Sequence, residues 1–215
     1  MKTPLLQKVR QSYKVQQVAM AASNALWSTI APLRRLSLPM VIARRSEVNI
    51  HFGCGDIADA RFINIDARPL PHVHLVTQSP MLHAFPENSA NSIYGCHVFE
   101  HLSFHTQKKV LRRWFDILKP GGRLRLSVPD FDKLVDKFLR TGRDPLSIQA
   151  TLMGGQNYAG NFHCAIFTNS HLGSLLQECG FVNVTAWHPR EEASWPNDHS
   201  WTDSVSLNLT AEKPI

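Results

Sequence analysis

The sequence predicts an α/β domain built on a doubly wound, mostly parallel sheet. Apolar runs of strand length alternate with helix-length segments from residue 47 onward, which is the pattern of a parallel sheet covered by helices on both faces. The first run, VNIHF at 48–52, ends in the turn Gly53-Cys54-Gly55. The last two runs, at 181–187 and 204–211, have no helix between them and predict an antiparallel hairpin at the C-terminal end.

The strands and helices follow from local patterns. Val110, Leu111, Trp114, Phe115 and Leu118 form one apolar face of a helix predicted over 105–118, with basic residues largely opposite, and Lys119-Pro120-Gly121-Gly122 is expected to end it. Further helices are predicted near 131–140 and at 169–179. The remaining strands are predicted at 62–65, 73–76, 93–98 and 123–128.

The first 46 residues differ from the rest of the chain in charge. They hold eight of the 23 basic residues and no acid, so residues 47–215 balance 15 basic against 17 acidic residues. We therefore predict two parts, a basic helical arm at 1–46 and a domain at 47–215. Residues 5–30 are expected to be helical, with Pro32 and Pro39 breaking the pattern. The arm could pack on the domain, lie on a membrane surface or be a transit peptide.

Composition limits the class of protein. The four cysteines, at 54, 96, 164 and 179, have no paired spacing, which favours reduced thiols and a cytoplasmic location. Peripheral membrane contact is expected only if the basic arm is the membrane-surface helix. No apolar run reaches the roughly 18 residues that cross a bilayer. The near-neutral charge of 47–215 argues against a domain that binds nucleic acid.

Two glycines and an acid mark a cofactor site. Gly53 and Gly55 let the backbone approach a ligand at the end of the first strand, and Asp66 ends the second strand, where it can accept both hydroxyls of a ribose. The third glycine of a dinucleotide motif is replaced by Ala58. The link to the second strand is also too short for a long phosphate-facing helix. A nucleoside cofactor without pyrophosphate fits better.

Several segments together resemble the class I S-adenosylmethionine-dependent methyltransferases. The resemblance covers roughly 47–210 and rests on NIHFGCG, FINID, IYGCHVFEHL, LRRWFDILKPGGRLRLSVPD and GGQNYAGNFHCAIFT, in that order. It implies a Rossmann-like fold and S-adenosylmethionine as cofactor. Carried over, it places the following residues around that cofactor: Phe52, Gly53, Cys54, Gly55, Asp66, Gln78, Leu82 and His97.

Four residues are candidates for the base that an oxygen acceptor needs: His97, His101, Asp130 and His163. His97 is expected beside the sulfonium end of the cofactor, and Asp130 could instead cap the helix that begins at Phe131. His97, His101 and His105 recur every four residues, but His97 is predicted to end a strand, so we expect no metal site.

We expect a methyltransferase that methylates a small molecule or a saccharide, by O-methylation. Relatives of this branch are often linked to polysaccharide synthesis. The alternative is a subunit that binds cofactor or a partner without methylating. It is motivated by Gln78 and Asn91, which stand where many relatives have Asp.

Overall fold

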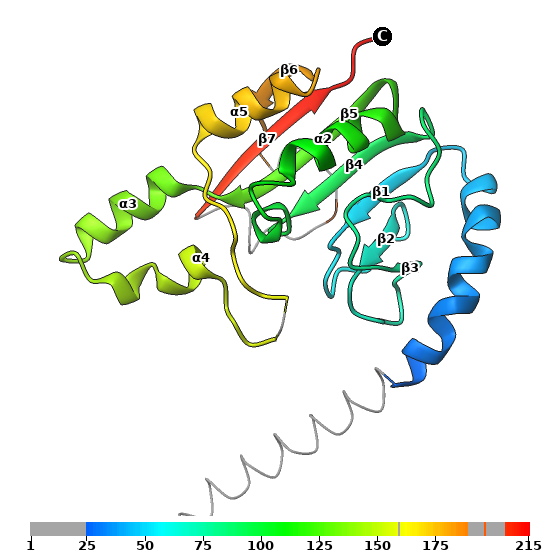
Figure 1. Cartoon of the computed structure of the whole chain (residues 1–215), viewed down its shortest axis with the longest axis horizontal. Coiled ribbons are helices and arrows are strands. Elements are labelled where there is room, and N and C mark those ends of the chain that lie inside the picture. Colours follow the sequence, from blue (N-terminus) through cyan, green and yellow to red (C-terminus); the bar gives the residue numbers. More distant parts are fainter. Residues whose placement is uncertain (1–24, 159, 189–195, 197–204) are drawn as a thin grey trace, which may run out of the picture.

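A seven-stranded sheet forms the centre of the domain (Figure 1). The computed structural model describes residues 25–158, 160–188, 196 and 205–215. The strands are β1 (Asn49–Phe52), β2 (Ile63–Asp66), β3 (Leu75–Val76), β4 (Ala90–Cys96), β5 (Leu118–Pro129), β6 (Val182–Ala186) and β7 (Ser206–Glu212). Their order is β3-β2-β1-β4-β5-β7-β6, and only β7 runs antiparallel to its neighbours. The predicted fold class is confirmed, and β7 inserts between β5 and β6.

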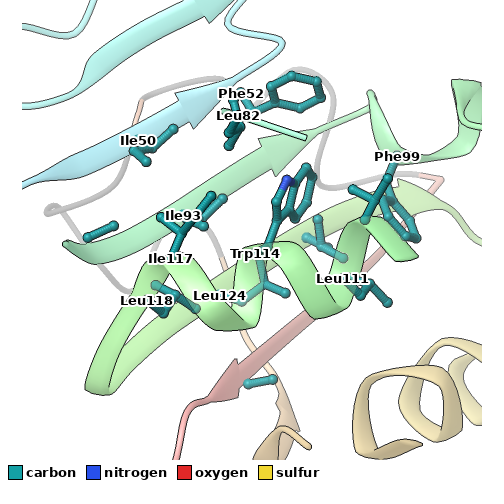
Figure 2. Packing of buried hydrophobic residues seen from close by; sticks show 14 of the residues in the cluster. Ile50, Phe52, Leu82, Ile93, Phe99, Leu111, Trp114, Ile117, Leu118 and Leu124 are labelled. Carbon is teal, nitrogen blue, oxygen red and sulfur yellow. The ribbon is translucent and has the colours of Figure 1, made fainter. Parts of the chain in front are cut away.

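One face of the sheet carries the main hydrophobic core. Alternate residues of the strands point to this face, because successive side chains of a strand point to opposite sides. Figure 2 shows Ile50, Phe52, Ile93 and Leu124 packed with Trp114 of the helix α2 (Gln107–Ile117). The indole N–H of Trp114 donates to the carbonyl of Pro80 at 2.7 Å, so its polar atom is satisfied inside the core.

The opposite face is built differently, with buried polar side chains among aromatic rings. His51, Tyr94 and Arg125 are buried there, and the guanidinium of Arg125 lies 4.7 Å from the centre of the Trp187 ring. The second apolar cluster, of Phe62, Tyr94 and Trp187, receives no residue from any described helix. The helices that contribute to the main core all pack on the same face of the sheet. Helical cover of the opposite face, which the sequence led us to expect, is not seen among the described residues. The β1–β2 and β2–β3 links are too short to hold a crossover helix.

The predicted helices after the first strand are present. They are α2 (Gln107–Ile117), α3 (Phe131–Arg140) and α5 (Asn169–Glu178), and the structure adds α4 (Gln149–Met153) and two short 3₁₀ helices, η1 (Phe99–His101) and η2 (Pro145–Ser147). α2 ends at Ile117, just before Lys119-Pro120-Gly121-Gly122 as expected, but neither glycine forms its C-cap. The chain turns directly into β5 at Leu118, whose backbone is extended, and the N–H of Gly121 donates to Lys213.

Before β1, the structure describes a helix over residues 25–43. Pro32 and Pro39 lie inside it, so the prediction that they break the helix is wrong. Both prolines are exposed, and water can solvate the carbonyl that each leaves without a partner. The helix packs on the domain through buried Leu38 and through Arg34, which donates to the carbonyls of Leu70, Pro71 and Val73 at 2.7–2.9 Å.

Other parts of the predicted arm lie outside the described residues, as does most of the long loop at 188–203. Among the described helices, none combines the length and the apolar character needed to cross a membrane. The carboxyl ends of the parallel strands lie at one edge of the sheet, and the candidate site residues lie near this edge.

Candidate active site

The glycine turn after β1 holds the ends of two strands together. Gly53 and Gly55 have φ values of 68° and 56°, the left-handed region that glycine adopts without strain. The N–H groups of Gly53 and Cys54 both donate to the carbonyl of Ile65, at 2.8 and 3.0 Å. The turn therefore lies directly beside the end of β2, whose last residue is Asp66.

Gly53 has a second reason to be glycine. A Cβ at this position would lie 2.4 Å from Cγ2 of Val98, a distance that real Cβ atoms essentially never show. Val98 belongs to the turn between β4 and η1. The missing side chain thus lets the β4 turn close against the β1 turn, and it joins the two halves of the site.

Asp66 is nearly buried, with 8% of its surface exposed, and its carboxylate is already hydrogen-bonded. Oδ2 accepts from the N–H of Gly55 at 2.8 Å, and Oδ1 accepts from the N–H and the Nε of Arg68 at 2.8 and 3.2 Å. Because a carboxylate offers about four acceptor positions, about one remains for a ligand. A ribose diol that uses two would displace the Arg68 side chain, which also lies 3.7 Å from Asp56.

The loop after β3 is held near Asp66, where the adenine contact is expected. The N–H of Thr77 donates to the carbonyl of Asp66 at 2.9 Å, and the hydroxyl of Thr77 accepts from Ser79. Gln78 is exposed between them. Leu82 has a φ of 48°, and its side chain is buried in the core.

Phe52 and Cys54 turn their side chains away from solvent. The ring of Phe52 packs on Trp114, with 5.4 Å between ring centres. Phe52 can therefore contact a cofactor through its backbone and not through its ring. Burial, with the nearby charge of Asp66, raises the pKa of the Cys54 thiol to about 12. Cys54 is therefore a neutral side chain packed under the turn, and it does not act as a thiolate.

His97 follows directly after β4, as predicted, and has an unusual backbone. Its φ is 49°, a conformation that costs a non-glycine residue free energy and that is often retained at functional sites. The N–H of His97 donates to the carbonyl of Ser127 on β5 at 2.9 Å. The ring nitrogens lie 2.7 Å from the Ser206 hydroxyl and 3.3 Å from Oε1 of Glu100.

Three further groups meet at η1, and with His97 they form what we call the histidine–glutamate cluster: His97, Glu100, His101 and His163. Glu100 is fully buried, and neither of its oxygens has a hydrogen bond within the described residues. Nε2 of His163 lies 3.7 Å from Oε1 of Glu100, and the rings of His101 and His163 meet edge to face at 4.7 Å. Burial lowers the pKa of His163, although the Glu100 carboxylate acts to raise it.

The segment between α4 and α5 closes this cluster. The N–H groups of Cys164 and Ala165 donate to the carbonyl of Glu100 at 2.8 and 3.2 Å, and Nδ1 of His101 lies 3.0 Å from the carbonyl of Phe162. In Figure 1 this segment passes the carboxyl ends of the central strands on its way to α5. Contacts between residues some 60 positions apart thus bring His163 to η1.

Asp130 is placed differently from the other candidates. Its carboxylate accepts from the N–H groups of Asp132 and Lys133 and so caps α3. Nζ of Lys133 lies a further 3.7 Å away. No contact between described residues joins Asp130 to the histidine–glutamate cluster, and its observed role is the capping role considered from the sequence.

Three residues to which sequence reasoning assigns no role contribute to the site: Arg68, Val98 and Glu100. Arg68 stands two residues after Asp66, a spacing that allows it to fold back on that carboxylate. Glu100 is the one acid in HVFEHL, where it follows two apolar residues and lies between two histidines, and an acid clustered with histidines is a candidate for a functional site. Nothing local in the sequence signals the contact between Val98 and Gly53.

A parallel sheet with a glycine turn after its first strand and an acid after its second defines a nucleoside-cofactor enzyme of the Rossmann-like class. A family model of the methyltransferase domain matches residues 41–186, and the chain belongs to this family. It is an S-adenosylmethionine-dependent methyltransferase. A search of curated proteins found no match.

Solved structures agree with this fold. An S-adenosylmethionine-dependent methyltransferase from Archaeoglobus fulgidus is 12% identical, with a TM-score of 0.51 over 94% of this chain and 99% of that one. The 1,6-didemethyltoxoflavin-N1-methyltransferase of Burkholderia thailandensis, solved with S-adenosylhomocysteine, is 16% identical, with a TM-score of 0.50 over 100% of this chain and 92% of that one. At these identities the similarity establishes the fold.

The residues present fit S-adenosylmethionine. The open space beside Gly55 and the one spare acceptor position of Asp66 suit a nucleoside without pyrophosphate. A Cβ on Gly55 would meet only the end of the flexible Arg68 side chain, at 3.4 Å. Gly53, Gly55 and Asp66 would hold the cofactor, with Gln78 at the adenine.

Proposed function

We propose that this enzyme methylates a hydroxyl oxygen of a small-molecule or saccharide acceptor. Bound S-adenosylmethionine supplies an electrophilic methyl group, so the protein must chiefly align the acceptor and exclude water. A hydroxyl, unlike a neutral amine, also needs a group that receives its proton. The choice between oxygen and nitrogen therefore depends on which side chains lie next to the cofactor turn.

The histidine–glutamate cluster is the observation that carries the proposal. It brings three imidazoles and a buried carboxylate to the end of β4, and Val98, within the same turn, packs on Gly53. His97 is held by Glu100 and Ser206, so its role would be to position Glu100. In the metal-free enzyme, His101 and His163 are the better candidates to receive a proton. A saccharide acceptor is supported only by the resemblance of the sequence to its branch.

The test is methyl transfer from isotopically labelled S-adenosylmethionine to a panel of hydroxylated small molecules, free and nucleotide-linked sugars, and matched amines. We expect a labelled O-methyl ether with at least one hydroxyl compound, and a large loss with His163→Ala but not with His105→Gln. His105 is exposed and lies outside the cluster. Labelling of amines alone would contradict O-methylation. Cofactor binding without any product would favour a subunit that does not methylate.

We also propose that the helix over 25–43 lies on a membrane surface. Leu26, Leu33, Leu36 and Met40 are each more than half exposed, and at helical spacing they form one stripe. Arg34 and Leu38 fix the other side to the domain. Such a stripe on an acid-free, basic segment suits an anionic bilayer. Sedimentation with anionic vesicles should fall sharply for Leu33→Ser/Leu36→Ser, and unchanged sedimentation would contradict the proposal.

A further inference from the structure

The carboxylate of Glu100 is buried without a hydrogen bond from the described residues. Burying a carboxylate is costly unless it is paired or coordinates a metal. The described groups that approach it as ion-pair partners are the imidazoles of His97 and His163, at 3.3 and 3.7 Å from Oε1.

The histidines next to Glu100 are oriented as metal ligands are. Nδ1 of His101 lies 3.0 Å from the carbonyl of Phe162, and the ring of His163 lies beside the backbone of Thr151 in addition to its Nε2 contact with Glu100. Ligand histidines commonly donate one ring nitrogen to a backbone carbonyl, which fixes the tautomer and leaves the other nitrogen free to bind. The supporting contacts are therefore in place.

We propose that Glu100, His101 and His163 bind a divalent transition-metal ion. One ligand atom from each residue lies within 4.8 Å of the others. Two ligands about 2.1 Å from a tetrahedral ion are themselves about 3.4 Å apart, so the 3.7 Å between Glu100 and His163 needs little adjustment. Two imidazoles and one carboxylate favour Zn²⁺, Mn²⁺, Fe²⁺ or Co²⁺ over Mg²⁺, which prefers oxygen ligands.

This site differs from the one considered from the sequence, which joined His97, His101 and His105. His105 precedes α2 and is exposed, and it is no part of the cluster. The observed site instead draws its third ligand, His163, from the segment between α4 and α5. An ion held there would link this segment to η1 and would compensate the buried charge of Glu100.

The test uses the full-length, untagged protein after treatment with a chelator. Co²⁺ is titrated while the visible absorption bands of the bound ion are recorded, and Zn²⁺ binding is measured by calorimetry. We expect one site per chain, visible bands of four- or five-coordinate Co²⁺, and a higher Tm in excess Zn²⁺. Glu100→Gln and His163→Asn should each weaken binding more than about 100-fold, beyond the 10–100-fold typical of outer-shell changes. His105→Gln should bind like the wild type.

Two results would overturn the proposal. One is the lack of a saturable Co²⁺ site in the wild-type protein. The other is unchanged binding in His163→Asn or His101→Gln, which would assign the ion to surface histidines. Far-ultraviolet circular dichroism shows whether each variant is folded. If Glu100→Gln does not fold, the two histidine variants decide, because both residues are only partly buried. Metal binding is read directly, so the result does not depend on the proposed acceptor.

Discussion

Val98 occupies the space that a side chain on Gly53 would need. A Cβ on Gly53 would lie 2.4 Å from Cγ2 and 2.7 Å from Cβ of Val98. This contact joins the cofactor turn after β1 to the turn that carries His97 and Glu100. Any shift of one turn is therefore transmitted to the other through a close-packed contact.

Gly53→Ala should be more destabilising than an ordinary glycine replacement. The left-handed backbone costs an alanine roughly 1–2 kcal/mol, and overpacking against Val98 adds about 1–3 kcal/mol. Gly142→Ala is the matched control, because Gly142 has a φ of 73° and a Cβ there would meet no atom within 4 Å. Urea unfolding measures both, and Val98→Ala should recover part of the loss in Gly53→Ala. Equal losses at the two glycines would show that Val98 is not the cause.

Arg68→Gln should bind S-adenosylhomocysteine more tightly than the wild type. Arg68 occupies Oδ1 of Asp66 through its Nε, and its side chain is more than a third exposed, so the pair is worth at most about 1 kcal/mol. Removing it should improve the dissociation constant by up to about fivefold. Arg61→Gln, which removes a comparable pair with Asp59, should have no effect. Weaker binding in Arg68→Gln would instead make Arg68 a cofactor ligand.

His51 should make the protein sensitive to mild acid. Burial lowers the pKa of His51 to about 3 from its ordinary value of 6.5, so between these pH values the unfolded chain binds a proton that the folded chain does not. The free energy of unfolding should fall as pH drops through this window, by up to about 1.4 kcal/mol per pH unit for this one group. His51→Phe should flatten the dependence, since the ring lies among Phe62 and Tyr94. An unchanged slope would contradict the assignment.

The cysteines should differ sharply toward alkylating reagents. Cys164 is exposed, whereas Cys54 is buried and its pKa is raised to about 12. Iodoacetamide at pH 8 followed by peptide mass spectrometry should label Cys164 within minutes and Cys54 only after unfolding. Rapid labelling of Cys54 in folded protein would mean that the turn opens readily.

Much of the fold can be predicted because its signals are local. The strand that ends at Phe52, the acid at the end of β2 and the helix Phe131–Arg140 follow from periodicity and capping residues. The extent of the helix over 25–43 does not follow, because the sequence does not show that Pro32 and Pro39 face solvent. The short β1–β2 link is evident from the sequence, but the burial of His51 and Arg125 among aromatic rings on one face of the sheet is evident only from the packing.

The site is predictable only as far as single motifs reach. The glycines and Asp66 are evident from their places at strand ends, and His97 from the end of β4. The contacts of Arg68 with Asp66, of Val98 with Gly53 and of His163 with Glu100 depend on how turns approach one another in space. Sequence spacing alone contains no information on such approaches. The partners of Glu100 therefore become visible only in the structure.

Calorimetric titration of S-adenosylhomocysteine into the wild type and Asp66→Asn tests the central claim most directly. The control is Asp56→Asn, since Asp56 is exposed and lies in the same turn region. We expect micromolar binding to the wild type and to the control, and a loss of roughly 10- to 100-fold in Asp66→Asn, as for a hydrogen bond to a charged group. Equal affinity in all three proteins would place the cofactor elsewhere. If none of the three proteins binds S-adenosylhomocysteine, the cofactor site at β1 and β2 is contradicted.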